Sequence, residues 1–314
     1  MSAKKIATCG LKIIALTLVM LLSFTVASIV SGISTPSAGA EPPPVDAGGT
    51  SLAMLVVSLL ETAVLAYVIL RSRWSGWKLV GAIFLAFYGL NTVVTQIESF
   101  VYLSHQLPAE MIPRLFAMGA IMAGLFSPLA VLILGKMRQG PAPQTSNPRQ
   151  GLPPREWAWK LAAIAVAYVI LYYVFGYFVA WKNPAVRAYY GGTDPGSFFA
   201  QIAWVWSTTP WMFPLQAARA MLWTAFVLPV IWMHKGRPWE VALAIALLSA
   251  VWSSQLLLPN PLMPEPVAKA HLVETALSNL IFGWLVGWLL SRRHPRHHNT
   301  HIVEIHNIPH PPES

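Results

Sequence analysis

Long apolar stretches alternate with short polar segments along the whole chain. Each stretch has about the 20 residues that a helix needs to cross roughly 30 Å of hydrocarbon. Eight stretches qualify: Leu11–Ile33, Leu52–Leu70, Leu79–Leu103, Leu115–Gly135, Leu161–Ala180, Trp211–Met233, Val241–Leu258 and Leu272–Leu290. The pattern predicts an all-α polytopic integral membrane protein with a bundle of eight transmembrane helices, or seven if the first is a cleaved signal peptide.

The composition points to the same class of protein. Of the 314 residues, 55% are hydrophobic and 11% are charged, whereas about 25% of the residues in a soluble protein are charged. This excludes an ordinary water-soluble domain, and the high apolar content excludes a disordered chain. The single cysteine, Cys9, allows no internal disulfide.

The distribution of Lys and Arg predicts the orientation. With the precursor N-terminus in the cytoplasm, 16 of the 21 basic residues fall in inner segments, as the positive-inside rule requires. Both ends of the precursor are then cytoplasmic. The short loops and the lack of an Asn-x-Ser/Thr sequence suit a bacterial inner membrane. The net charge of +9 is accounted for by this bias and by contact with anionic lipid headgroups, so we expect a lipid bilayer and no nucleic acid as partner.

The polar segments divide the chain into six regions. They are a signal peptide or first transmembrane helix (1–33), a flexible outer linker (34–51), transmembrane helices two to four (52–135), a Pro-rich cytoplasmic loop (136–160), transmembrane helices five to eight (161–290) and a His-rich disordered cytoplasmic tail (291–314). No convincing repeat relates the first four spans to the last four.

The outer loop 182–210 contains an apolar run that is too short to span the membrane. The run Phe198–Trp206 carries two tryptophans, which is typical of an interfacial or re-entrant helix at the headgroup level. We therefore expect one such helix in this loop, either as an anchor or as a lid over an outward-facing cavity.

Ionisable residues inside the spans are the candidates for function, because they are costly in lipid and usually face the bundle interior. Glu61 lies roughly 13 Å and Arg219 roughly 12 Å below the outer ends of their helices. Their matched depth predicts an ion pair, which either locks two helices together or contributes to a substrate site. Asn91 and Glu98 belong to a polar stripe on one face of the third span.

The eighth span carries a second polar group near its outer end. His271 and Glu274 are three residues apart and share one helical face with neighbouring hydroxyl groups, and Asn279 is adjacent. Glu98 lies at a similar depth, so Glu98, His271 and Glu274 are predicted to converge. Such a set either holds a zinc ion with an open position for water or relays a proton, while a simple His–Glu hydrogen bond is the alternative.

Three functional hypotheses follow from these residues. We favour a small-solute or proton-coupled binding or transport protein with a polar site in the outer half of the bundle. The alternatives are a membrane-embedded, metal-dependent hydrolase of a lipid-like substrate, and a structural or regulatory membrane partner. The sequence shows no clear pair of broken helices of the kind that secondary transporters use. It does not indicate an oligomeric state.

Overall fold

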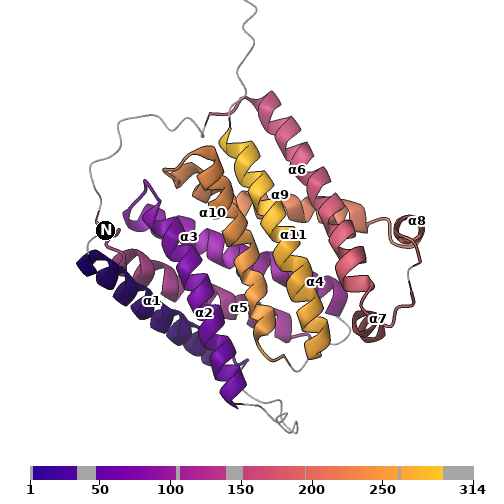
Figure 1. The fold of residues 1–314 in the computed structure, drawn as a ribbon, viewed down its shortest axis with the longest axis horizontal. Coiled ribbons are helices and arrows are strands. Elements are labelled where there is room, and N and C mark those ends of the chain that lie inside the picture. Colours follow the sequence, from indigo (N-terminus) through magenta and orange to yellow (C-terminus); the bar gives the residue numbers. More distant parts are fainter. Residues whose placement is uncertain are drawn as a thin grey trace, which may run out of the picture.

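The chain forms a bundle of long helices in a computed structural model that describes residues 3–33, 47–103, 107–138, 151–194, 196–260 and 263–292 (Figure 1). Its elements are α1 (Ala3–Val30), α2 (Ala47–Leu70), α3 (Gly76–Tyr88), η1 (Gly89–Val93), α4 (Val94–Leu103), α5 (Met111–Ile133), α6 (Pro154–Phe175), η2 (Gly176–Trp181), α7 (Pro184–Tyr190), α8 (Phe198–Thr208), α9 (Met212–Met233), α10 (Pro238–Val251), η3 (Trp252–Leu257) and α11 (Glu265–Ser291). The described residues contain no β-sheet, only two isolated bridges.

Eight helical spans in the described residues are long and apolar enough to cross a membrane. They agree with the eight predicted stretches, which confirms the all-α polytopic class. The six-region division is not tested, and the cores of the predicted linker, Pro-rich loop and His-rich tail lie outside the described residues.

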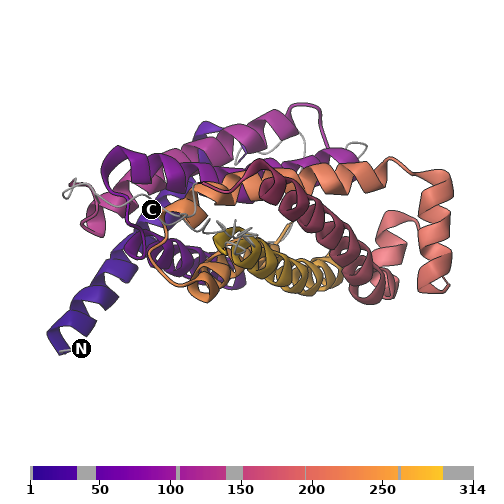
Figure 2. The same ribbon diagram turned by 90° about the horizontal axis from the view of Figure 1, so that it is seen from above.

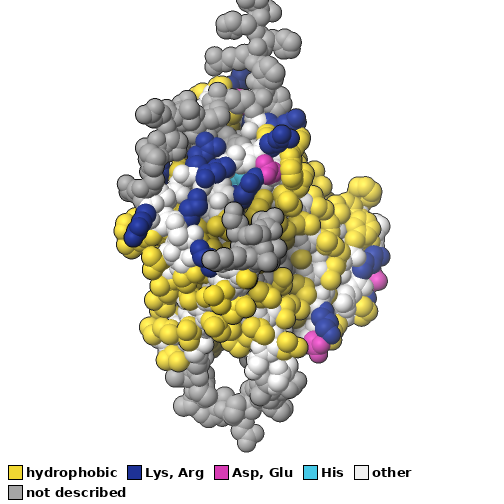
Figure 3. Space-filling model, turned by 60° about the vertical axis from the view of Figure 1, so that its left-hand side comes forward, with side chains coloured by type: hydrophobic (Ala, Val, Ile, Leu, Met, Phe, Trp, Pro, Cys, Tyr) yellow, Lys and Arg dark blue, Asp and Glu magenta, His cyan; other side chains and the backbone are white. Residues whose placement is uncertain are grey.

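One end of the bundle is rich in basic residues. The turns that join α2 to α3 and α9 to α10 meet there, and Figure 3 shows Lys and Arg side chains gathered above a broad hydrophobic band. We call this the basic end; its residues include Arg71, Arg73, Lys136, Lys235 and Arg237. Arg71 forms an ion pair there with Glu240, and Lys136 Nζ donates to the Ser72 carbonyl at 2.9 Å.

Two short helices occupy the segment that was predicted to hold one. α7 begins at Asn183, whose side chain accepts a hydrogen bond from Ala185 N at 2.9 Å, and α8 begins at Ser197, which accepts from Ala200 N at 3.2 Å. Figure 2 shows these helices at one extremity of the molecule, beside α6 and α9. α8 matches the predicted run, and its exposed Trp204 and Trp206 suit a position at the membrane interface.

Three of the spans in the described residues depart from the α-helix: the third in its middle, and the fifth and seventh over their last residues, where the π-helical η2 and the 3₁₀ η3 lie. The third span changes from α-helix to a π-helical turn at η1 before it continues as α4, and the seventh span tightens to a 3₁₀ helix at η3. Such changes of helix type leave backbone groups with altered partners and often mark functional segments. Hydrophobic patterning does not predict them.

The two groups of four spans pack in the same way. In the first half α1 contacts α2 and α5, and α3 contacts α5; in the second half α6 contacts α9 and α11, and α10 contacts α11. Between the halves, α2 contacts α10 and η3, while α9 contacts α3 and η1. These reciprocal contacts are those of two four-span repeats related by an approximate two-fold axis along the helices.

The turns at the basic end lie on this axis. Ser72 and His234 form an antiparallel bridge. It is flanked by the reciprocal bonds Arg73 N to Met233 O at 2.7 Å and Lys235 N to Arg71 O at 2.9 Å. The bridged residues are 162 positions apart in the sequence. When residue n of α2–α3 is aligned with residue n + 162 of α9–α10, no gap is needed.

The aligned repeats share residues as well as contacts. Identical pairs are Leu60/Leu222, Thr62/Thr224, Ala63/Ala225, Val68/Val230, Ile69/Ile231, Trp77/Trp239, Ala82/Ala244, Ile83/Ile245 and Leu85/Leu247. Most buried positions of 57–92 also have a buried counterpart at this offset. The repeat that was not evident in the sequence is therefore present in the fold.

Candidate functional site

One ion pair in the apolar part of the bundle joins the two repeats. Arg219 on α9 contacts Glu98 on α4, with 2.5 Å between Nη2 and Oε1. The Arg219 side chain is 4% exposed and that of Glu98 is 36% exposed. A guanidinium that cannot be neutralised is thus held inside the protein by a carboxylate that lies nearer the surface.

Two further side chains lie against Arg219. Its Nη1 donates to Gln216 Oε1 at 2.7 Å, and its guanidinium carbon lies 5.7 Å from the centroid of the Tyr168 ring on α6. Gln216 is fully buried, and its Nε2 has no hydrogen-bond partner among the described residues. A buried donor without a partner costs free energy, so this amide is available to an added acceptor beside the guanidinium.

The pairing of Arg219 differs from the sequence expectation. Depth predicted a Glu61–Arg219 pair, but Arg219 pairs with Glu98 instead. Depth along a helix does not fix which helices are neighbours: α9 contacts α4 and η1, whereas α2 contacts α1, α10 and η3. The prediction was wrong about the partner because the packing order of the helices cannot be read from hydrophobic patterning.

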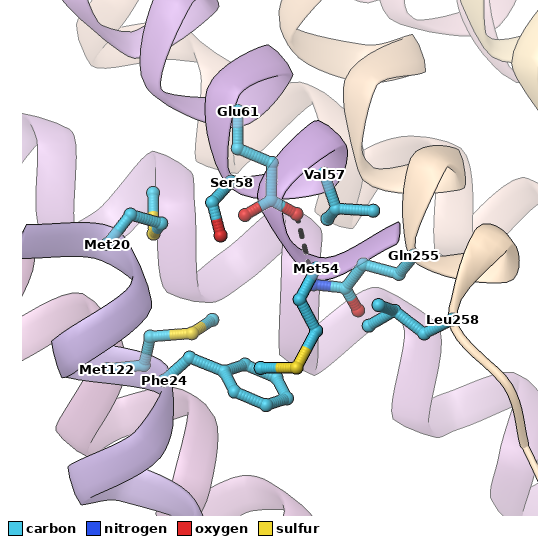
Figure 4. Close-up of a pocket in the computed structure, with 9 residues that line it drawn as sticks. All are labelled: Met20, Phe24, Met54, Val57, Ser58, Glu61, Met122, Gln255 and Leu258. Carbon is cyan, nitrogen blue, oxygen red and sulfur yellow. Dashed lines mark hydrogen bonds between the residues drawn. The ribbon is translucent and has the colours of Figure 1, made fainter. Parts of the chain in front are cut away.

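Glu61 forms a second polar centre in the first repeat, one helical turn from the position equivalent to Arg219. Its carboxyl group, 2% exposed, accepts a hydrogen bond from Gln255 Nε2 of η3 at 3.1 Å. Figure 4 shows the carboxyl group directed into a small cavity between helices, with Ser58 beside it and methionine side chains opposite. The cavity is lined by Met20, Phe24, Met54, Val57, Ser58, Glu61, Met122, Gln255 and Leu258.

His271 and Glu274 pair at the start of α11. His271 Nδ1 lies 2.7 Å from Glu274 Oε2, and the Tyr190 hydroxyl of α7 lies 3.3 Å from His271 Nε2. Glu98 is paired with Arg219, and no group of three His, Cys, Asp or Glu side chains within the described ranges is placed to hold a metal ion. The zinc site therefore stays a prediction.

The two asparagines named from the sequence lie in different surroundings. Asn91 is buried in η1, and its Oδ1 has no hydrogen-bond partner in the described part of the chain. Asn279 is half-buried on α11, and nothing connects it to the Arg219 site.

Sequence reasoning missed Gln255, Tyr168 and Tyr190, each of which contacts a predicted residue. The internal repeat is the signal that could have found Gln255. Since α9 contacts the third span of the first repeat, the equivalent α2 is expected to contact the third span of the second repeat, which contains Gln255. At the offset of the repeats, the counterpart of Thr62-Ala63 is Thr224-Ala225.

Comparison with known proteins gives no relative from which a function can be taken. No family model matches the chain, and neither the curated proteins nor the solved structures contain a significant match.

Proposed function

We propose that this integral membrane protein binds and transports a small anionic solute together with a proton. The anion binds Arg219 in place of the Glu98 carboxylate, and the proton binds Glu98. The observation that carries the proposal is the buried Arg219–Glu98 pair across the interface of the repeats. Arg219 supplies a permanent positive charge, and its planar guanidinium matches a carboxylate or phosphate group.

The charge balance of the pair explains why a proton accompanies the solute. In the resting state Glu98 neutralises Arg219. When Glu98 takes up a proton, the buried guanidinium loses its counter-charge, and an anionic group replaces the carboxylate. The site stays neutral in both states, which avoids the cost of an isolated buried charge.

The surrounding polar groups favour an oxygen-rich ligand. Gln216 Nε2 has an unused hydrogen-bond donor within the site, and one oxygen of a carboxylate accepts from it while Arg219 binds the other. The ring of Tyr168 provides an apolar face next to the guanidinium. These groups suit a small carboxylate better than a neutral sugar or a cation.

The architecture supports movement of a solute as well as binding. Many transporters are built from two internal repeats, with the site at their interface and helices interrupted there. Here Arg219 and Glu98 come from different repeats, and both third spans of the repeats are interrupted at η1 and η3. Rocking of one repeat against the other is the motion that this arrangement favours.

We further propose that the basic end faces the cytoplasm of a bacterial cell, with the protein in the inner membrane. The concentration of Lys and Arg at that end follows the positive-inside rule. The Arg219 site then lies in the outer half of the bundle, toward the end that carries α7 and α8.

The two alternatives gain less support. A metal-dependent hydrolase needs a third ligand beside His271 and Glu274, and the described residues offer none. A purely structural role accounts for the ion pair but gives no reason for the unpartnered amide of Gln216.

The test is stabilisation of the detergent-purified full chain by acetate, succinate, glutamate and phosphate, measured by thermal unfolding at about pH 5.5 and about pH 7.5. We expect at least one anion to raise the midpoint by several degrees, and more at the lower pH. Glu98→Gln mimics the protonated state, so it should bind the same anion equally well at both pH values.

Lys269→Gln is the matched control, since Lys269 is exposed and pairs with the exposed Glu265; this variant should respond as the wild type does. Arg219→Gln should lose the response. Stabilisation by no member of the panel, or equal stabilisation of Arg219→Gln, would overturn the proposal.

A further inference from the structure

The cavity beside Glu61 has no role in the proposed anion site, yet it contains the most deeply buried carboxyl group in the apolar region. Its polar lining is limited to Glu61, Ser58 and Gln255, and the remainder is methionine, phenylalanine and aliphatic side chains (Figure 4). The free space beside the carboxyl group has room for about one water molecule. An organic cation is too large for this space without rearrangement of the helices.

No basic side chain balances Glu61 in the described part of the protein. The elements packed around it are α1, α5 and η3 in addition to its own helix, and no cavity-lining residue other than Glu61 is charged. The charged residues of those elements lie nearer the helix ends: Lys12 on α1 and Arg114 on α5 are eight residues from the nearest lining residue of their helix, about 12 Å along it. Lys136 and Glu240 lie at the basic end.

A carboxylate in these surroundings is costly as an anion. The single hydrogen bond from Gln255 does not replace the hydration that a carboxylate loses on burial. The group is therefore stable when it carries a proton, and the proton is the one cation for which the cavity needs no enlargement.

The two-fold relation of the repeats also connects Glu61 with Arg219. Glu61 and Arg219 lie on equivalent helices, and their positions differ by one helical turn at the offset that aligns the repeats. Each reaches the interrupted third span of the other repeat: Arg219 contacts Glu98 just beyond η1, and Glu61 contacts Gln255 within η3. The two centres are thus counterparts of opposite charge.

We propose that Glu61 is a second binding site, the counterpart of the Arg219 site, and that its ligand is an exchangeable proton. The carboxylate accepts the proton from a hydronium ion that reaches the cavity, which leaves a neutral carboxyl group and one water molecule; the reverse step returns the proton to water. The lining residues Phe24, Met54 and Leu258 lie on the side away from the basic end, so the exchange occurs toward that side.

This proposal does not depend on the anion site, since Glu61 makes no contact with Arg219 or Glu98. A change in the occupancy of Glu61 nevertheless acts on η3 through Gln255, and η3 belongs to the opposite repeat. Proton exchange at Glu61 is thereby connected to the interface across which the repeats would move.

The experiment is chemical modification of the full chain in membrane vesicles with dicyclohexylcarbodiimide, followed by mass spectrometry of its peptides. This reagent partitions into apolar regions and adds only to protonated carboxyl groups, which it converts to stable acylureas. We expect Glu61 to be modified, with a rate that falls as pH rises and approaches about a tenfold decrease per pH unit once the deprotonated form predominates. Glu98, which is ion-paired with Arg219, and Glu274, which is hydrogen-bonded to His271, are internal comparisons that should react far less.

Three variants complete the test. Gln255→Leu removes the hydrogen bond that favours the carboxylate, so modification of Glu61 should persist to higher pH than in the wild type. Arg219→Gln should leave the modification of Glu61 unchanged, which separates this proposal from the anion proposal. Met54→Ala enlarges the cavity, so that the size of the reagent does not prevent its reaction with Glu61. An unmodified Glu61 at every pH in this variant as well as in the wild type, or a modification rate that does not vary between about pH 5 and pH 9, would overturn the inference.

Discussion

Arg219 and Glu98 are unequal partners, because the guanidinium is almost completely buried and the carboxylate is partly exposed. Water can solvate Glu98 if its partner is lost, but it cannot reach Arg219 as readily. Removal of one partner of a buried pair is costly chiefly because the other charge is left without compensation. The two single truncations should therefore differ in severity.

We expect Glu98→Ala to lower the free energy of unfolding by roughly 2–4 kcal/mol and Arg219→Met to lower it by less. The double variant should be more stable than Glu98→Ala alone, because it leaves no buried charge. Chemical denaturation in detergent measures all three. Equal losses from the two single variants, with additive loss in the double, would show that the pair is not buried as described.

At the residue scale, the sequence predicted which polar groups are inside but not which of them touch. Arg219 and Glu61 are both buried, and His271 contacts Glu274 as their spacing of three indicates. The Arg219–Glu98 contact depends on the arrangement of α9 and α4, and nothing local in either helix specifies that neighbour.

At the scale of elements, α10 and α11 pack closely because glycines face the contact. A Cβ placed on Gly283 would lie 2.7 Å from the Ile245 carbonyl oxygen and 2.9 Å from Ala246 Cα. Small residues of this kind let two membrane helices approach each other. The sequence predicted the lengths of these helices, but the π-helical and 3₁₀ interruptions at η1 and η3 depend on tertiary contacts with the other repeat.

Gly283→Ala should lower the free energy of unfolding by about 1–3 kcal/mol, because backbone atoms of α10 cannot move away cheaply. Gly81→Ala on α3 is the control: its new Cβ meets no atom within 4 Å, so the change should be neutral or stabilise by up to about 1 kcal/mol. Thermal unfolding of the two variants distinguishes them. A tolerated Gly283→Ala would be inconsistent with the close approach of the helices.

The free energy of unfolding should depend on pH through Lys136, which contacts the α2–α3 turn at the basic end. Burial and the nearby Lys235 lower the pKa of Lys136 below its ordinary value of 10.5. The folded state therefore binds this proton less tightly than the unfolded state, and the resulting penalty is present at neutral pH and is lost as pH rises from the lowered pKa toward 10.5.

Lys235→Gln removes the repulsion between the Lys235 and Lys136 ammonium groups. We expect a higher unfolding midpoint than that of the wild type at about pH 7, with the difference shrinking toward about pH 10. Midpoints measured across this range test the assignment. A difference that grows with pH would have the opposite sign and would refute it.

At the scale of the whole molecule, the bundle consists of two four-span repeats that begin and end at the same side. Hydrophobic patterning predicted the number of spans because each span must satisfy its backbone within itself. The repeat was not predicted, because identical residues are scattered among apolar positions, where many different side chains satisfy the same packing.

An even number of spans per repeat also places every basic turn on one side. In a background with Cys9 replaced by Ala, Thr193→Cys should react with a membrane-impermeant maleimide in intact bacterial cells, because residue 193 lies at the end opposite the basic one. Arg138→Cys, exposed at the basic end, should react only after the cells are permeabilised. The reverse pattern would invert the orientation.

The central claim is that a proton at Glu98 is exchanged for an anion at Arg219, and proton uptake on binding tests it most directly. Titration calorimetry with the anion that best stabilises the protein, performed at about pH 7 in two buffers of different ionisation enthalpy, gives the number of protons taken up per anion bound. The account predicts uptake of close to one proton by the wild type and of none by Glu98→Gln, with both proteins binding the anion. Binding without proton uptake by the wild type would contradict it.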